Sequence, residues 1–305
     1  MKHTVRHIVE YSLLRALVFL LGLLPLRAAL AMGALLGFKA WFLGIRRRVV
    51  MTNLHQAFPG NTAADNRRIG ARSYANIGRT MVEIARQRRI DGRFLGRNIV
   101  VEGTEALEFL RREGGIGLSF HFGNWEMTGL LMRHLVGDVS FLVGEQHNEL
   151  VDGYLNGLRA SHGIGLITRG GAMKEIFRVI RGKGVMCWLS DQDAGRNGLV
   201  VDFLGWPAST PRGAAAFAVK TGCAVVPLLL VRESAERQRL VCGNPILAPR
   251  DIPPDQAELQ VTRDYTAFLE EWVRRRPDLY WWAHRRWKTT GLYRRNREEK
   301  VPDGG

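Results

Sequence analysis

The stretch IGLSFHFGNWE, residues 116–126, decides the fold class and contains a histidine that is a candidate for catalysis. Residues 116–120 form a short apolar run of the kind found in buried strands. Gly123 permits a tight turn, and Asn124 is a favoured N-cap for a helix that follows. Because strands that alternate with helices are typical of α/β domains, the stretch predicts that class.

The spacing of His121 and Glu126 excludes one continuous helix as their means of contact. Five residues along a helix turn through about 500°, which would place the two side chains on different faces. If a strand ends at His121 and a helix begins after Asn124, Glu126 lies in the first helical turn, folded back toward the imidazole. A carboxylate there would fix the tautomer of His121 and stabilise the imidazolium. We therefore predict that His121 is a general base and that Glu126 orients it.

The same residues also allow a purely structural role for His121 and Glu126. Many isolated histidines are satisfied structural residues, and the helix dipole alone favours a glutamate in the first helical turn.

The remainder of the chain repeats the alternation of strands and helices. Residues 48–97 are polar with apolar positions at a helical period, which indicates one or two amphipathic helices. After them, short strand-like runs are separated by helical patterns, so we expect a largely parallel or mixed sheet. The expected strands are residues 99–101, 116–120, 139–143, 185–189, 200–203, 224–231 and 239–241, and the expected helices are residues 124–135, 150–162, 172–181, 212–221 and 258–275.

Composition narrows the class of partner. The chain has 305 residues, 46% of them hydrophobic, and a formal net charge of +15, so it can bury a core and favours anionic partners. Phospholipid headgroups, an acidic carrier protein and nucleic acid all satisfy that charge. The three cysteines have neither metal-ligand nor disulfide spacing.

The N-terminal segment favours a membrane among those partners. Residues 11–42 are dominated by apolar residues, and the charges that interrupt them leave uncharged cores at residues 16–26 and 28–38. Each core is shorter than the roughly 20 residues of a spanning helix. We expect residues 1–48 to form membrane-associated helices that lie in or dip into the interface, followed by an α/β domain over residues 49–305. A buried helical hairpin is the alternative.

Further motifs supply candidates for ligand binding. Arg169 lies in a Thr-Arg-Gly-Gly turn where a phosphate would be bound, although a glycine-rich turn with a solvated arginine explains it as well. The acids of Asp191-Gln192-Asp193 follow an apolar run, and such strand ends border ligand crevices in α/β folds. Two acids without a histidine partner do not define a metal site.

A second helix start and an aromatic run complete the set of motifs. Thr210 would cap a helix with Pro211 at its first position, which places Arg212 near the helix N-terminus. Residues 280–288, YWWAHRRWK, mix indoles with cations and suit headgroup depth. Such mixing also occurs in single-strand nucleic-acid binders, but the apolar N-terminus favours the membrane.

Taken together, these motifs resemble the late acyltransferases of lipid A biosynthesis, the lauroyl and myristoyl acyltransferases within the glycerolipid acyltransferase superfamily. The resemblance rests on the histidine and acid five positions apart, on Gly-Asn-Trp-Glu at 123–126, Asp-Gln-Asp at 191–193 and Pro-Arg-Gly-Ala-Ala at 211–215, and on the aromatic run. It implies a glycerol-3-phosphate acyltransferase-like mixed sheet flanked by helices. The expected site residues are His121 and Glu126 for catalysis and Asn124, Trp125, Arg169, Asp191, Asp193, Thr210 and Arg212 for substrate binding.

The resemblance also implies a reaction and its partners. An acyl group would pass from a thioester, of acyl carrier protein or else of coenzyme A, to a hydroxyl of a lipid A precursor or related glycolipid, with no cofactor and no metal. The expected partners are the carrier, an anionic lipid acceptor and the membrane surface, not nucleic acid, at the cytoplasmic face of a bacterial inner membrane. Acylation of a lysophospholipid or a phosphatidylinositol mannoside remains an alternative, as does a non-catalytic basic membrane-binding protein.

Overall fold

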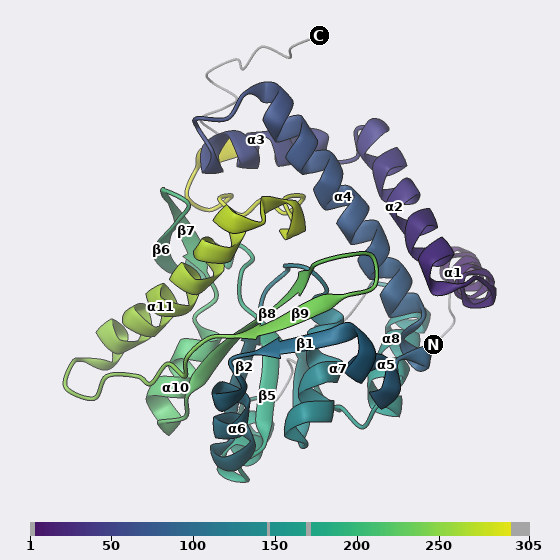
Figure 1. The fold of residues 1–305 in the computed structure, drawn as a ribbon. Coiled ribbons are helices and arrows are strands. Elements are labelled where there is room, and N and C mark those ends of the chain that lie inside the picture. The colour runs from purple at the N-terminus through teal and green to yellow at the C-terminus, as the bar shows by residue number, and fades with distance from the viewer. Residues whose placement is uncertain (1–3, 145–146, 169–171, 294–305) are drawn as a thin grey trace.

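The computed structural model describes residues 4–144, 147–168 and 172–293 (Figure 1). Five α-helices precede the first strand, and strands and helices then alternate as expected, except that two pairs of strands follow one another directly. The helices are α1 (Val5–Leu23), α2 (Leu26–Phe42), α3 (Arg47–Ala57), α4 (Ala63–Ala85), α5 (Gly92–Asn98), α6 (Thr104–Glu113), α7 (Trp125–Val136), α8 (Glu149–Ser161), α9 (Ala172–Arg181), α10 (Gly213–Thr221) and α11 (Pro254–Arg275). The strands are β1 (Ile99–Glu102), β2 (Gly115–Ser119), β3 (Val139–Val143), β4 (Gly165–Thr168), β5 (Val185–Leu189), β6 (Leu199–Phe203), β7 (Trp206–Thr210), β8 (Val225–Arg232) and β9 (Gln238–Cys242), and short 3₁₀ turns follow at Gln87–Arg89, Gly195–Asn197 and Pro277–Leu279.

The main sheet has seven strands in the order β1-β9-β8-β2-β5-β3-β4. Its pairs are parallel except for the antiparallel pair of β8 and β9, so the predicted mixed sheet is confirmed. The expected strand at 200–203 lies outside this sheet, because β6 pairs only with β7 in a separate hairpin among the described residues. Strand β4 and strand β7 were not among the expected strands.

Helices cover both faces of the sheet, and β8 shows why. Its residues alternate: Val225, Leu229 and Val231 pack in the core with α9, α10 and α11, whereas Leu228 and Leu230 pack in the core with α6 and α7. A strand that is buried on both sides needs a continuous apolar sequence, which is what β8 has. The sheet is therefore the central layer of three.

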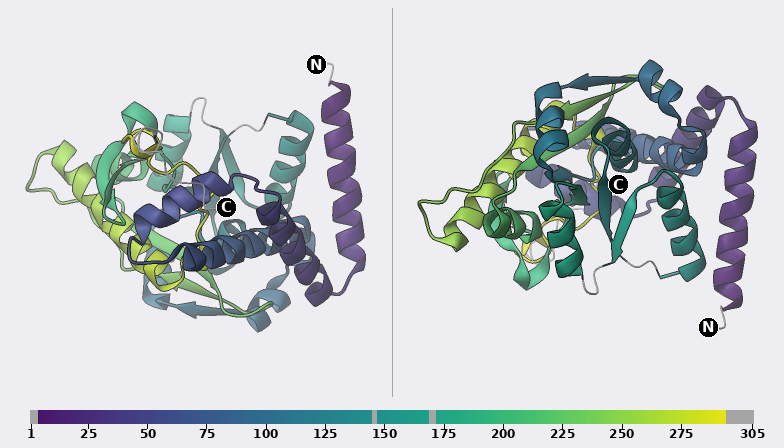
Figure 2. Two further views of the ribbon diagram at one scale, coloured as in Figure 1. Left: turned by 90° about the horizontal axis from the view of Figure 1, so that it is seen from above. Right: turned by 90° about the horizontal axis from the view of Figure 1, so that it is seen from below.

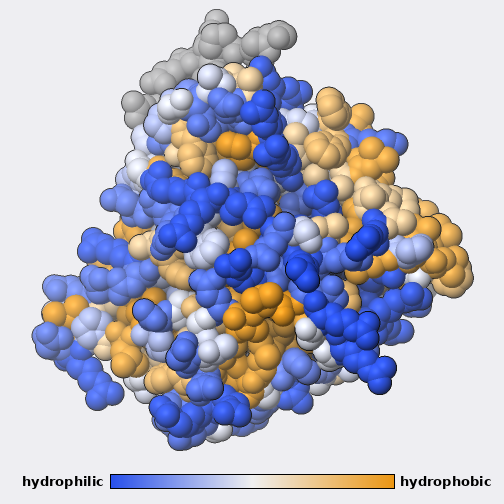
Figure 3. All heavy atoms as spheres, viewed as in Figure 1, coloured by the Kyte–Doolittle hydropathy of each residue, from blue (hydrophilic) through white to orange (hydrophobic). Residues whose placement is uncertain are grey.

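The N-terminal helices lie to one side of this sandwich. Helix α2 packs closely on α4, where Gly33 meets Gly78: a Cβ added to Gly33 would come 2.5 Å from the Gly78 carbonyl oxygen. Helix α1 runs along the margin of the molecule in both views of Figure 2. Apolar residues collect over α1 and α2 at this edge in Figure 3. Eight large apolar side chains of α1 are exposed: Val5, Ile8, Val9, Leu13, Leu17, Phe19, Leu20 and Leu23.

The predicted pair of N-terminal helices is thus present, and α2 is partly buried in the way that a helical hairpin would be. Within the described residues no helix by itself has the length and apolar character to cross a membrane. The pair α2 and α3 meets both criteria when taken together, with a bend of 91° between them.

Candidate active site

A histidine and a buried aspartate form the centre of the site. His121 Nδ1 lies 2.8 Å from Asp191 Oδ1, and the backbone N–H of His121 donates to Asp191 Oδ2 at 3.0 Å. The Asp191 side chain is 1% exposed, whereas that of His121 is 18% exposed. The imidazole is therefore clamped on its protein side and accessible on the other.

Strand register explains how residues 70 positions apart meet. Strands β2 and β5 are parallel neighbours, with Ser119 opposite Leu189. His121 and Asp191 each lie two residues beyond this aligned pair, so both side chains emerge at the carboxyl edge of the sheet. Ligand sites of α/β folds form at this edge.

The carboxylate determines the tautomer of the histidine. Burial raises the pKa of Asp191, but the charge and hydrogen bonds of His121 outweigh burial and leave that pKa below its ordinary value. An ionised Asp191 accepts a hydrogen bond from Nδ1–H, so the proton stays on Nδ1 and the lone pair is on Nε2. The side-chain amide of Gln192, 3.2 Å away, donates to that lone pair. His121 is thus set up to accept a proton at Nε2.

The predicted contact between His121 and Glu126 is wrong. Glu126 lies in the first turn of α7 as expected, but its carboxylate accepts two hydrogen bonds from Arg159 of α8, with Nε–Oε2 at 3.1 Å and Nη2–Oε1 at 2.5 Å. The reason is that Asp191 already occupies the Nδ1 side of the ring. Arg159, a residue that no sequence motif indicated, neutralises Glu126 instead. Whether Glu126 acts in catalysis stays a prediction.

A cavity of about 1280 Å³ opens beside the pair, and His121, Trp125, Glu126 and Arg159 line it. Typical small-molecule sites enclose roughly 300–1,000 Å³, so this cavity has room for a large substrate. Its apolar side chains come from both faces of the sheet: Phe141, Cys187 and Leu228 on the α7 side, and Ile176, Trp188 and Phe217 on the α9 and α10 side. A cavity lined by both polar and apolar groups suits an amphiphile.

Cys187 is the thiol that lines this cavity, and it is unsuited to nucleophilic chemistry. Burial raises the pKa of Cys187 to about 12. A thiol must ionise to act as a nucleophile, so Cys187 acts as an apolar wall.

Three of the expected substrate-binding residues are enclosed by protein: Asp191, which holds His121 instead, and also Asn124 and Thr210. Asn124 is buried, caps α7 by accepting from the Met127 N–H, and donates to Glu83. Thr210 is 0% exposed and accepts a hydrogen bond from Arg286. Direct contact of either side chain with substrate is thus at odds with the structure, because neither reaches the cavity surface.

The other expected residues have varied surroundings. Trp125 lines the cavity and packs edge-on against Trp281. Asp193 also lines it, while accepting from the backbone and hydroxyl of Thr289. Arg212 pairs with Glu258 at the surface, with its Nε 3.0 Å from Oε2. Arg169 lies outside the described residues.

No group of three or more histidine, cysteine, aspartate or glutamate side chains with metal-binding geometry occurs among the residues that the structure describes.

The fold and the site define an α/β protein with a histidine–aspartate pair at the carboxyl edge of a mixed sheet, beside a large cavity that polar and apolar side chains line. The chain belongs to the bacterial lipid A biosynthesis acyltransferase family, whose model matches residues 1–289. The recognition made from the motifs is thereby confirmed.

Individual relatives extend this comparison. A phosphatidylinositol mannoside acyltransferase of Mycobacterium tuberculosis is 30% identical over 163 residues, 51% of this chain and 52% of that protein. The Escherichia coli lipid A biosynthesis palmitoleoyltransferase is 23% identical over 253 residues, 81% of this chain and 80% of that protein. A Shigella flexneri lipid A biosynthesis acyltransferase matches to the same extent. The chain thus spans about half the length of the mycobacterial relative and most of the enterobacterial ones.

Proposed function

We propose that this protein transfers a fatty acyl group from an acyl thioester to a hydroxyl of a lipid A precursor or related glycolipid. The observation that carries the proposal is the His121–Asp191 pair beside a large cavity with both polar and apolar walls. Family membership and the relatives' names support the same reaction class.

The reaction follows from the tautomer of His121. The acceptor hydroxyl takes the place of the Gln192 amide at Nε2, and its proton passes to Nε2 as its oxygen attacks the thioester carbonyl. The imidazolium is stabilised by Asp191. When the tetrahedral intermediate collapses, the carbon–sulfur bond breaks and the thiolate takes the proton from Nε2. The products are an ester and a free thiol, and no acyl-enzyme forms.

The start of α7 supplies candidates for stabilising the oxyanion. The first N–H groups of a helix have no intrahelical acceptor, and Trp125 and Glu126 at the first positions of α7 both line the cavity. N–H donors placed where negative charge develops make a large contribution to catalysis of acyl transfer. The apolar walls beyond them would receive the acyl chain.

Charge supports the proposed partners. The net charge of +15 favours both an acidic acyl carrier protein as donor and an anionic lipid as acceptor. We infer that the donor is acyl carrier protein in preference to coenzyme A, because the family acts in lipid A biosynthesis. We also infer that Glu126, paired with Arg159, contacts substrate in the cavity.

The exposed apolar side chains of α1 support membrane association. In a chain of this size, a surface with so many large apolar residues indicates an interaction site. We propose that residues 1–48 lie at the cytoplasmic face of the bacterial inner membrane and deliver the lipid acceptor to the α/β domain of residues 49–305.

A phosphatidylinositol mannoside acceptor is the second candidate, because the 30% identity to the mycobacterial enzyme exceeds the 23% identity to the enterobacterial one. The acceptors separate the two. Purified protein would be assayed with acyl–acyl carrier protein and either a lipid A precursor or a phosphatidylinositol mannoside, and the acylated product identified by mass spectrometry.

A His121→Ala variant is the control for catalysis in that assay. We expect it to lose roughly 10²- to 10⁴-fold in rate, which is typical for a positioned base. Equal rates in His121→Ala and wild type, or no product with any acceptor, would favour the non-catalytic membrane-binding alternative.

A further inference from the structure

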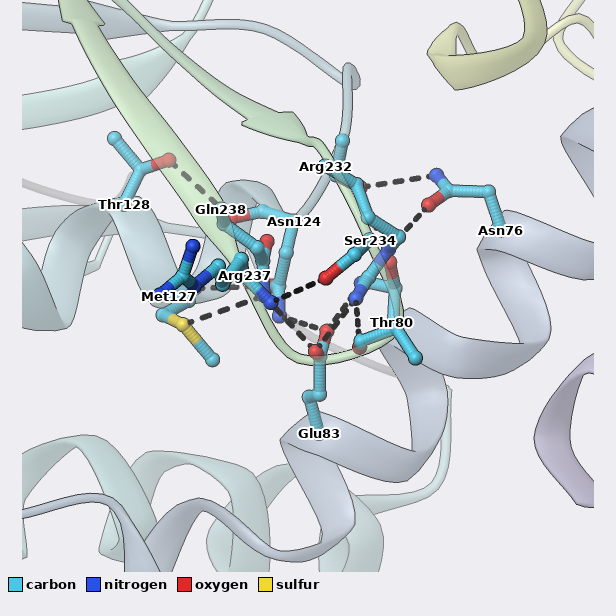
Figure 4. Close-up of polar contacts among 12 residues, drawn as sticks. Asn76, Thr80, Glu83, Asn124, Met127, Thr128, Arg232, Ser234, Arg237 and Gln238 are labelled. Carbon is cyan, nitrogen blue, oxygen red and sulfur yellow. Dashed lines mark hydrogen bonds and ion pairs between the residues drawn. The ribbon is translucent and has the colours of Figure 1, made fainter. Parts of the chain in front are cut away.

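A buried ionic cluster contacts Asn124 (Figure 4), in the turn that follows His121. Its centre is Glu83 of α4, 4% exposed, which pairs with Arg232 of β8, 6% exposed, through bonds of 2.8 Å and 2.5 Å. The same carboxylate accepts from Gln238 of β9 at 2.9 Å and from Asn124 at 2.7 Å. One side chain of α4 thus joins two strands of the main sheet to the N-cap of α7.

A second set of bonds from α4 ends one residue earlier in the turn. The Gly123 carbonyl accepts from the Thr80 hydroxyl at 3.1 Å and from the Asn76 amide at 3.5 Å. Arg232 donates to the Asn76 side-chain oxygen at 2.8 Å, which directs the Asn76 amide nitrogen toward Gly123. Glycine adopts the φ of +59° at Gly123 without strain, so the bonds orient this peptide rather than offset backbone strain.

Stability alone does not account for the cluster. A buried ion pair contributes little net stability, and apolar residues of similar volume would often hold the same elements together as well. What apolar packing lacks is direction. Asn124 donates a hydrogen bond to Glu83, and Thr80 donates one to the Gly123 carbonyl. These bonds fix the orientation of both groups between His121 and the first turn of α7.

We propose that Thr80 and Glu83 are positioning residues that hold the His121 turn in register with Asp191 and with the start of α7. The expected effect on the rate rests on the proposed acyl transfer. The expected effect on the orientation of His121 rests on geometry alone. A misplacement of about 1 Å at a reacting group can lower a rate 10²-fold, so the effect on catalysis is expected to be measurable.

The matched pair Thr80→Val and Thr80→Ser tests the proposal. Valine keeps the shape of the fully buried threonine and removes the donor to Gly123, whereas serine keeps the donor. Glu83→Gln, which keeps the size of the side chain and removes its charge, is the second variant. Leu110→Ala, in the core on α6 and away from the turn, is the control for loss of stability.

The first readout requires no substrate. In full-length protein labelled with ¹⁵N-histidine, NMR detects the Nδ1–H proton that His121 donates to Asp191, assigned by its loss in His121→Ala. We expect this signal to shift or broaden in Thr80→Val and Glu83→Gln and to stay in place in Thr80→Ser and Leu110→Ala. An unchanged signal in both Thr80→Val and Glu83→Gln overturns the proposal, whatever the enzyme acylates.

The second readout is kinetic. With acyl–acyl carrier protein and the glycolipid acceptor, we expect kcat to fall about tenfold in Thr80→Val, with KM changed less than about twofold, and to recover in Thr80→Ser. Wild-type protein without transfer activity would refute the proposed function, and the NMR signal would still decide the positioning role. Equal losses of kcat in Thr80→Val and Thr80→Ser would contradict a role for the hydroxyl.

Discussion

His121 and Asp191 meet because each lies two residues beyond an aligned pair of neighbouring parallel strands, Ser119 on β2 and Leu189 on β5. Their contact is therefore a consequence of sheet register. Any change that keeps the sheet but alters the Asp191 carboxylate acts on the orientation and charge of the imidazole.

Asp191→Asn is expected to lower kcat by roughly 10²- to 10⁴-fold while the fold is retained. The amide cannot stabilise an imidazolium as a carboxylate does, and it also permits the wrong tautomer of His121. Acyl transfer assays with circular dichroism of the purified variant measure both. Asp202→Asn, on the exposed face of β6, is the matched control and is expected to have wild-type activity. Activity in Asp191→Asn within a few fold of wild type would exclude Asp191 as the partner of the base.

Glu126 and Arg159 are expected to act as one unit. Both side chains are mostly buried at the cavity wall and neutralise one another, so removing one leaves the other as an uncompensated charge. We expect Glu126→Gln and Arg159→Gln each to lower kcat/KM and the double variant to be no worse than the poorer single variant. A double-mutant cycle on kcat/KM checks this. Strictly additive losses would mean that the two side chains serve separate steps.

Much of the architecture could be predicted from the sequence, because it depends on local patterns. The apolar run of residues 116–120 and the capping residue Asn124 predicted β2 and α7, and both are present. The partner of His121 could not be obtained in this way. Glu126 is near in sequence, but only the pairing of β2 with β5 brings Asp191 to the imidazole, and strand order is not written in any single motif.

The same limit applies to the cluster around Glu83. A glutamate in an amphipathic helix is predicted to be exposed to solvent, since acids are rarely buried without a partner. Its partner Arg232 lies 149 residues away, at the end of a strand that is otherwise apolar. Arg232 was the one indication in the sequence, because an arginine at the end of a buried strand requires an acidic partner.

The apolar wall at Cys187 is expected to set the length of acyl chain that is accepted. Cys187→Leu adds volume inside the cavity and should shift preference toward shorter acyl chains, measured as relative kcat/KM for a series of acyl–acyl carrier proteins. Cys223→Leu, at a partly buried thiol that does not line the cavity, is the control. Activity retained in Cys187→Ala would agree with a wall, whereas abolished activity there would point to a covalent role for the thiol.

His284 is expected to make the fold sensitive to acid. Burial lowers its pKa from 6.5 to about 4, and its Nδ1 has no hydrogen-bond partner among the described residues. The unfolded chain therefore takes up a proton near pH 6.5 that the folded protein resists until about pH 4. The contribution of neutral His284 to the free energy of unfolding is therefore complete above pH 6.5 and is lost as the pH falls toward 4.

Urea denaturation of wild type and His284→Gln across that pH range tests the linkage. The wild-type midpoint should fall more steeply on acidification than that of His284→Gln, and the exposed His55 provides the control as His55→Gln. Parallel midpoints for wild type and His284→Gln would show that His284 does not couple to folding.

Helix α1 is expected to supply most of the affinity for membranes. Leu13, Leu17 and Leu20 are 43–66% exposed, and an apolar side chain that leaves water gains about 25 cal/mol per Å². Replacing all three by glutamine should lower binding to anionic phospholipid vesicles in a flotation assay by an order of magnitude or more, because the lost burial amounts to several kcal/mol. The purified triple variant is expected to keep its thermal stability, since these side chains contribute little to the core.

Leu247→Gln, which removes an equally exposed leucine from a different surface, should bind vesicles as wild type does. If the triple variant floats with the vesicles as well as wild type, the apolar surface of α1 is not the membrane contact.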